Sequence, residues 1–344
     1  MTAAVARVLV WSAAALVVLG AGAWGTLALH YLDLSPGWLR EALVVLNGLL
    51  GLIALASIGA GRRRRLLLSL FAVAFVGLLL YWRTITPRND RDWAPEVARL
   101  PFATIAGDLV TLHDIRNFDY RAETDFTPAY YDRTFDLRRL DAVDLVASYW
   151  MGPAIAHVFV SFAFGDDHVA VSIEARKERG EGYSSVQGFF KRYELIYVVG
   201  DERDLVRVRT NYRRDPPEDV YLYRVRGPAE NRRRLFLAYV RAINALRDEP
   251  RFYDTLTTNC TTTILLHTRV NPGHLPLSWK VLLSGHAAEY AWEQGRLDTS
   301  LPFAELERRS RINDAARAAD QAPDFSRRIR EGRPGMTGGV GGGS

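Results

Sequence analysis

The sequence predicts a mixed α+β domain that follows three transmembrane helices. Residues 1–82 contain three long apolar runs, each of the length needed to cross a bilayer. The rest of the chain alternates short β-rich segments with turns and then becomes rich in helical patterns, which is typical of an α+β domain. We expect a membrane domain over 1–83, an exported domain over 84–335 and a disordered glycine-rich tail over 336–344.

The apolar runs cover residues 8–29, 42–60 and 66–82. Runs of roughly 17 to 22 apolar residues are typical of spanning helices rather than of core helices. The first run is too long for the apolar part of a signal peptide, and two more spans follow it. We therefore expect it to be retained as a span.

Four consecutive arginines at 62–65 set the predicted orientation. They lie in a very short loop between the second and third spans, and such basic loops stay in the cytoplasm. The third span then runs outward, so everything after Arg83 is expected in the periplasm of a Gram-negative cell, anchored in the inner membrane. The same arginines can also bind anionic lipids.

Two strands and the turn between them carry the first site prediction. Residues 156–164 and 169–175 read as strands, and a two-residue turn at Asp166-Asp167 would pair residues whose numbers add to 333. In that register Phe159 lies opposite Glu174, which makes His157 and Glu174 diagonal neighbours on one face. The other face holds the apolar residues predicted to form the core: Val158, Val160, Phe162, Phe164, Val169, Val171 and Ile173.

The remaining elements follow from hydrophobic period and turn residues. Strands are expected within 104–113, at 143–149 and at 220–225, with a hairpin formed by 193–199 and 205–210. Helices are expected at 231–247, from Cys260 onward, within 277–294 and at 303–319, whereas 116–139 receives no assignment.

Cys260 is the only cysteine, so the chain cannot form an internal disulfide. It follows Asn259, which with Thr258 is a candidate N-cap for a helix that starts at the thiol. The helix dipole and free N–H groups there would favour a thiolate with a depressed pKa, and Asn259, Thr261 and Thr262 would support the cap or an oxyanion. The alternative is an inert buried thiol.

A thiol nucleophile needs a base in reach and a group that orients this base. His267 is seven residues after Cys260, about 10 Å along a helix axis and too far for a hydrogen bond. His157 is the one histidine inside a clear strand, with Glu174 beside it. We therefore expect His157 as base and Glu174 as its orienting carboxylate, or alternatively a solvated or ion-paired Glu174.

Other chemistries find little support in the sequence. No close spacing of histidine, cysteine and carboxylates matches a zinc pattern, and no glycine-rich phosphate loop is present. The arginines are scattered and do not predict a nucleic-acid-binding face. We expect no cofactor, no metal and no nucleic-acid partner.

The order of a strand histidine before a helix cysteine is that of circularly permuted papain-like (NlpC-type) thiol enzymes. Several motifs resemble the Lnb-type periplasmic domain family, which is associated with bacterial lipoprotein N-acyltransferases. They are Asn89-Asp90-Arg91-x-Trp93, Ala156-His157-x-Phe159-x-Ser161-Phe162, Ser172-Ile173-Glu174-Ala175-Arg176-Lys177-Glu178, Glu194-Leu195-Ile196-Tyr197, Asp201-Glu202-Arg203-Asp204 and Asn259-Cys260-Thr261-Thr262. The resemblance spans about residues 85 to 300 and implies Cys260 as nucleophile and His157 as base. This chain differs from the best-known members because its spans precede the domain.

The expected activity is a thiol-dependent acyl transfer. Cys260 would take an acyl chain from a phospholipid as a thioester and pass it to an amine, such as the N-terminus of a lipoprotein, with the membrane holding both substrates nearby. One alternative is a cysteine peptidase, amidase or lipid hydrolase of the cell envelope. A second is a membrane-anchored binding module without catalytic activity.

Overall fold

The computed structural model describes residues 3–59 and 63–336 and divides into two compact units. One unit comprises residues 1–88 together with 184–193, and the other comprises 89–183 together with 194–344. The arginine at position 62 and the glycine-rich tail beyond residue 336 lie outside the described residues.

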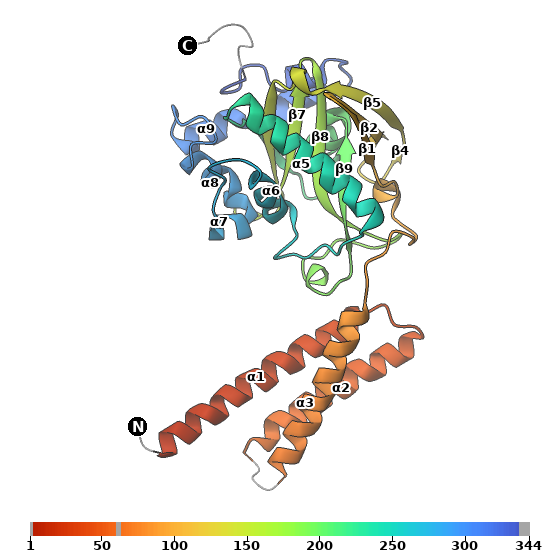
Figure 1. Ribbon diagram of the computed structural model, residues 1–344, viewed down its shortest axis with the longest axis vertical. Coiled ribbons are helices and arrows are strands. Elements are labelled where there is room, and N and C mark those ends of the chain that lie inside the picture. The colour runs from red at the N-terminus through yellow and green to blue at the C-terminus, as the bar shows by residue number, and fades with distance from the viewer. Residues whose placement is uncertain (1–2, 60–62, 337–344) are drawn as a thin grey trace. The chain divides into compact units, whose positions relative to one another are not determined.

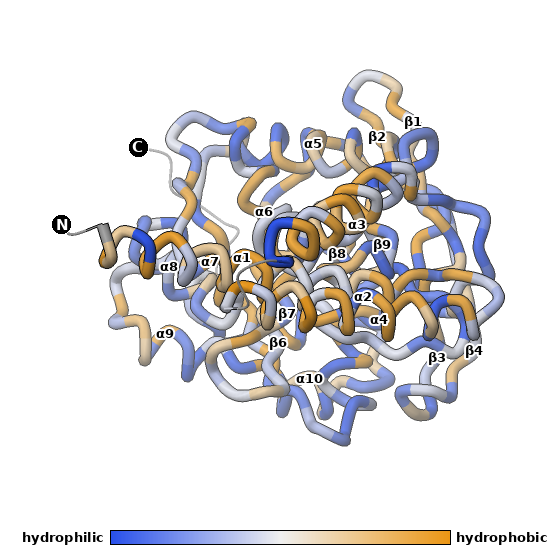
Figure 2. Tube along the Cα trace, turned by 90° about the horizontal axis from the view of Figure 1, so that it is seen from below, coloured by the Kyte–Doolittle hydropathy of each residue, from blue (hydrophilic) through white to orange (hydrophobic). Residues whose placement is uncertain are grey.

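The first unit contains three long helices, which are α1 (Ala3–Tyr31), α2 (Gly37–Ser57) and α3 (Arg64–Thr84). All three are long and apolar enough to cross a membrane, as predicted, and they are mostly orange in Figure 2. Asn47 donates to the hydroxyl of Thr26 at 2.9 Å, so the polar residue in α2 is bonded to α1.

Segment 184–193 also belongs to this unit. Phe190 stacks on Tyr31 with ring centroids 5.4 Å apart. The ammonium of Lys191 donates to the carbonyl oxygens of Trp82 and Ile85 at 2.8 and 3.1 Å. A cation at this position satisfies carbonyl groups that the end of α3 leaves without a partner in the helix.

The second unit is built on a large, mainly antiparallel sheet with the order β1-β2-β9-β8-β7-β6-β10, and β5 pairs with β2. Its strands are β1 (Phe102–Ala106), β2 (Leu109–Arg116), β5 (Tyr130–Asp136), β6 (Ala142–Tyr149), β7 (Ala156–Phe164), β8 (Asp167–Arg176), β9 (Glu194–Gly200) and β10 (Asp219–Arg224). A two-stranded sheet pairs β3 (Asp119–Tyr120) with β4 (Phe126–Thr127).

Helices cover both faces of the large sheet. On one face α5 (Ala229–Asp248) packs Phe236 against Phe162 with ring centroids 5.0 Å apart, and α6 (Cys260–Thr268) lies beside it (Figure 1). The other face packs Phe159 and Ala170 against Leu205 and Ile312. The remaining helices are α4 (Glu202–Arg207), α7 (Trp279–Leu282), α8 (Ala287–Glu293), α9 (Phe303–Ser310), α10 (Asn313–Ala318) and α11 (Phe325–Arg328).

The predicted register of β7 and β8 was wrong by two residues. The structure pairs Val160 with Val171 and Phe164 with Asp167, so the numbers of paired residues add to 331. The turn uses Gly165, whose φ of +68° suits a tight hairpin and is unfavourable for other residues. A shift of two residues keeps every side chain on its predicted face. Both faces are buried, however, and not only the predicted core face.

The predicted hairpin of 193–199 with 205–210 was also wrong. After β9, Asp201 caps α4 by accepting from the backbone N–H of Arg203 at 2.8 Å, and a π-helical turn at Val208–Tyr212 follows. The β-branched residues Val206 and Val208 favoured a strand, but the cap and the acidic first turn prevail. The helix expected over 303–319 is divided into α9 and α10.

Arg330 ties the C-terminal segment into the second unit. Its guanidinium lies 2.8 Å from Asp144 and 2.6 Å from Glu202, and both carboxylates are fully buried. Removing one partner of a buried ion pair leaves an uncompensated charge, which costs far more than losing an exposed pair.

We therefore expect Arg330→Ala to lower the free energy of unfolding by about 3 to 5 kcal/mol. Arg327→Ala is the matched control, because Arg327 pairs with Asp324 and Glu331 at the surface. It should cost less than about 1 kcal/mol. Thermal or urea unfolding followed by tryptophan fluorescence measures both, and equal losses would contradict the structural role of the buried pair.

Candidate functional site

Cys260 is the first residue of α6, as predicted, and Asn259 is its N-cap. The side-chain oxygen of Asn259 accepts from the backbone N–H of Thr262 at 2.9 Å, and the Thr262 hydroxyl accepts from the backbone N–H of Asn259 at 3.1 Å. This reciprocal capping box fixes the first turn of the helix. The Thr261 hydroxyl donates to the carbonyl oxygen of Val281 at 2.7 Å, which holds the turn against α7.

The thiol of Cys260 lies against the start of β7. The backbone N–H groups of Val158, Thr261 and Cys260 itself are directed at the sulfur, and each favours the thiolate. The last residue pair between β7 and β8 at this end of the sheet is Val160 with Val171. Val158 lies two residues N-terminal to Val160. Val158 and its neighbour His157 direct their side chains to opposite faces of β7. Val158 faces α6, whereas the His157 ring stacks on Phe159 on the other face, and no hydrogen bond joins Cys260 to His157 among the described residues.

The electrostatic environment of the thiol differs from the sequence-based expectation. Burial raises the pKa of Cys260, and the charge of Glu174 raises this pKa further, while the three N–H groups lower it. Cys260 is only 8% exposed. The prediction of an accessible thiol with a depressed pKa was therefore wrong, because desolvation of the charged form outweighs the stabilisation provided by the helix end.

His157 and Glu174 meet through a serine on the second face of the sheet. The Nε2 atom of His157 lies 2.6 Å from the Ser172 hydroxyl and 3.7 Å from the nearer carboxylate oxygen of Glu174. The Ser172 hydroxyl donates to the same carboxylate oxygen at 2.7 Å. The predicted proximity of His157 and Glu174 is therefore confirmed, although the predicted register was not.

This hydrogen-bond network defines the tautomer of His157. Because the single proton of the Ser172 hydroxyl goes to Glu174, this hydroxyl accepts from His157, and Nε2 carries the proton. In the neutral ring, Nδ1 then has the free lone pair. No described residue forms a hydrogen bond to the Nδ1 atom of His157, so this nitrogen is available as a base.

Arg209 completes the charged cluster, and no motif or spacing in the sequence indicates this role. It lies in the π-helical turn and donates to Glu174 at 3.0 Å, while its Nε atom is 3.9 Å from Glu218. π-Helical turns insert one residue into a helix and often occur at functional sites. Glu218 in turn accepts from the buried Ser148 hydroxyl.

These neighbours set the charge of each group at neutral pH. Burial and the Arg209 cation lower the pKa of His157 to about 4, so the imidazole is neutral. Burial opposes ionisation of Glu174, but the cations of Arg209 and Arg116 and the hydrogen bond from Ser172 outweigh it and hold the pKa of this carboxyl well below its usual range. A neutral histidine thus lies beside an ionised carboxylate.

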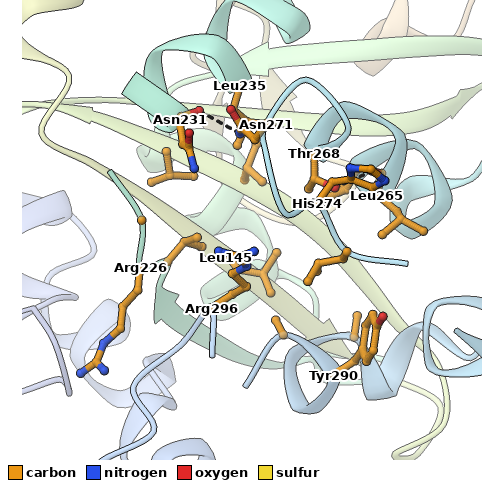
Figure 3. Close-up of a pocket in the computed structure, with 18 of the residues that line it drawn as sticks. Leu145, Arg226, Asn231, Leu235, Leu265, Thr268, Asn271, His274, Tyr290 and Arg296 are labelled. Atoms are coloured by element: carbon orange, nitrogen blue, oxygen red, sulfur yellow. Dashed lines mark hydrogen bonds between the residues drawn. The ribbon is translucent and has the colours of Figure 1, made fainter. Parts of the chain in front are cut away.

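An apolar cavity of about 150 Å³ lies on the α5 and α6 face of the sheet (Figure 3). Val158 and Thr261, which flank the thiol, form one of its ends. No group of three or more histidine, cysteine or carboxylate residues in the described part of the chain could hold a metal ion.

Residues 126–285 match the family model of the Lnb N-terminal periplasmic domain. The second unit thus carries a domain of the Lnb type. The matched region includes β7, β8 and α6 and therefore the histidine, carboxylate and thiol described above. No curated protein and no solved structure matches the chain significantly. The family match and the three apolar helices together indicate a membrane protein with a periplasmic Lnb-type domain.

The raised pKa of Cys260 predicts slow alkylation in the folded protein. The pH midpoint for iodoacetamide labelling should lie above the roughly 8.5 of a free thiol, because burial and Glu174 both disfavour the thiolate. Glu174→Gln should move the midpoint downward, since it removes a negative charge. Mass spectrometry of the labelled Cys260 peptide over a pH series measures both. A wild-type midpoint below 8.5 would contradict the burial argument.

Proposed function

We propose that this protein is a thiol-dependent acyltransferase of the bacterial inner membrane. The observation that carries the proposal is the position of Cys260. Cys260 begins a capped helix that packs on β7, the backbone N–H groups of Val158, Thr261 and Cys260 favour its thiolate, and the residue before Val158 is a neutral histidine with a free Nδ1 atom. The strand-histidine, helix-cysteine order of permuted papain-like enzymes supports the same assignment.

In the first step, which requires the His157 ring to reach the thiol around the start of β7, the thiol proton moves to Nδ1 of His157 as the sulfur attacks the carbonyl carbon of a phospholipid ester. Ser172 and Glu174 hold the ring and stabilise the imidazolium that forms. The tetrahedral intermediate collapses, the carbon–oxygen bond of the ester breaks, and the alcohol leaves as a lysophospholipid with the proton from His157. The acyl chain remains on Cys260 as a thioester.

In the second step an amine attacks the thioester carbonyl carbon. His157 accepts a proton from the amine, the carbon–sulfur bond breaks, and the sulfur regains a proton. The most suitable acceptor is the N-terminal amine of a diacylglyceryl lipoprotein, because it is held at the same bilayer surface as the donor. Positioning of this kind lets an amine compete with water for the thioester.

The raised pKa of the thiol favours general-base catalysis over a preformed thiolate. In such a mechanism the base must be neutral in the resting protein, and His157 with a pKa of about 4 is neutral at pH 7. The same burial also favours the binding-module alternative, in which Cys260 is inert. A hydrolase of lipids or cell-wall peptides shares the first step, with water as the acceptor.

The first test compares variants of the cluster. His157→Ala should lower the rate of thioester formation about 10²- to 10⁴-fold, the usual contribution of a general base. Ser172→Ala and Glu174→Gln should cost less, because they position the ring and do not transfer the proton. Wild-type activity should fall as the pH drops through about 4, where His157 becomes protonated. A fully active His157→Ala protein with an unchanged melting temperature would refute the assignment.

The second test identifies the reaction class. Purified protein is incubated with phospholipid and a synthetic diacylglyceryl-cysteine peptide. A transferase produces N-acyl peptide and lysophospholipid in near-equal amounts, and Cys260→Ser produces neither. Free fatty acid with no acylated peptide would instead identify a lipid hydrolase, and cleavage of cell-wall peptides alone would identify an amidase. No product and no adduct on Cys260 would favour the binding module.

A further inference from the structure

The apolar cavity has a buried end and an open end. At the buried end lie Val158 at the start of β7, Thr261 in the first turn of α6 and Val281 in α7. At the open end lie exposed residues that follow β10 and α6, among them Arg226 and His274. The cavity is therefore a blind pocket that points from the surface toward the thiol.

The floor of the cavity gives its depth. Val143 lies opposite Phe162, and Leu145 lies opposite Val160, so the floor residues from Val143 to Val158 cover four residue steps along β7. At about 3.3 Å per residue this corresponds to roughly 13 Å. An apolar cavity of this length can take up an extended alkyl chain.

The interior is apolar over most of this length. Leucine, isoleucine and valine side chains from β6, β7, α5 and α6 line it, and Tyr290 turns its hydroxyl to the carbonyl oxygen of Pro276 at 2.8 Å. An empty apolar cavity of this size stays dry and takes up apolar ligands. Such a site binds the chain of a ligand without requiring polar partners for it.

Three arginines gather at the open end (Figure 3 labels Arg226 and Arg296). The backbone N–H of Arg226 donates to the carbonyl oxygen of Arg296 at 2.7 Å, and a guanidinium N–H of Arg232 donates to Gly227 at 2.8 Å. These contacts hold the three residues around one turn. Three cations at the mouth of an apolar pocket are complementary to an anionic head group.

Two of these arginines have no carboxylate partner among the described residues. Arg226 pairs with Asp298 at 2.6 Å, whereas Arg232 and the Arg296 guanidinium donate to carbonyl oxygens. The Nε atom of Arg232 is buried without a hydrogen-bond partner. Burial lowers the pKa of Arg232, with Asp141 opposing and Arg224 adding to this effect. An anion bound at the mouth would relieve this unfavourable desolvation.

We propose that this cavity binds a single-chain amphiphile, with its alkyl chain directed toward the thiol and its anionic head group held by Arg232 and Arg296. The head group is a carboxylate, as in a fatty acid, or a phosphate, as in a lysophospholipid. The site is distinct from the acyl-donor position, because a donor must present its carbonyl carbon to Cys260, at the opposite end from the arginines.

The test uses the full-length Cys260→Ser protein in nanodiscs, so that binding is measured without turnover. A diazirine-bearing fatty acid is photoactivated, and mass spectrometry locates the labelled peptides. Labelling of the peptides that contain Leu145 and Ile264 is compared with labelling of the membrane helices, which serve as an internal reference. Dodecanoate, dodecanol and a lysophosphatidyl lipid are the competitors.

We expect the cavity to be labelled and the label to be displaced by dodecanoate or the lysolipid. The concentration needed should be at least about tenfold lower than the concentration of dodecanol that gives the same displacement, since charge-assisted hydrogen bonds favour the anion. The better of the two anionic competitors identifies the head group. Arg296→Gln and Arg232→Gln should each remove about tenfold in affinity, and Arg308→Gln, on the exposed side of α9, should change nothing.

Variants that fill the cavity test the position of the chain. Leu235→Trp should abolish cavity labelling, and the smaller change Ala287→Leu should weaken it if the first variant does not fold. Leu266→Trp is the control, because Leu266 is exposed on the same helix as Ile264 and lies outside the cavity lining. Equal displacement by dodecanol and dodecanoate, or labelling unchanged in the filled variants, would overturn the proposal while leaving the acyltransferase question open.

Discussion

The ion pair between Arg209 and Glu174 is the interaction on which the arrangement around His157 depends. Its atoms are 3.0 Å apart, and Arg209 is almost fully buried. The Arg209 cation keeps Glu174 ionised despite burial, while burial and the same cation keep His157 neutral, so one guanidinium acts on the charge of both neighbours. Ser172 then connects the two and determines which ring nitrogen carries the proton. Without Arg209, a protonated and uncharged Glu174 would become more favourable, and the tautomer of His157 would no longer be defined by the network.

Burial at the thiol and burial at the histidine have related consequences. Both disfavour a charged group, so the thiol and the imidazole are each neutral in the resting protein. The three N–H groups at the sulfur offset part of that cost and are already oriented, since the capping box and the strand fix them. Burial keeps the thiol protonated in an oxidising compartment, where a permanent thiolate is readily oxidised. The N–H groups stabilise the negative charge on the sulfur when it forms.

Much of this arrangement could be predicted from the sequence because it depends on local signals. The three spans follow from long apolar runs, the helix start at Cys260 follows from the Asn259 cap, and the faces of β7 and β8 follow from alternation with a period of two. The register was missed because it depends on the positive φ of Gly165, which the competing turn at Asp166-Asp167 concealed. Arg209 could not be predicted, since it reaches Glu174 through a π-helical turn and across 35 residues of chain. Burial of the thiol depends on packing between distant segments, which no local pattern encodes.

Residues 184–193 belong to the first unit, which limits how the membrane helices and the second unit could be exchanged between related proteins. The chain of the second unit is discontinuous, because it is interrupted between β8 and β9 by a segment that contributes Phe190 and Lys191 to the membrane helices. A chimera that joins the membrane helices of one protein to the remainder of a related protein at a single junction after residue 88 would separate Tyr31 from Phe190 and Trp82 from Lys191. A functional chimera therefore needs two junctions, and substitutions in this segment should co-vary with α1 and α3 more than with the strands that flank it.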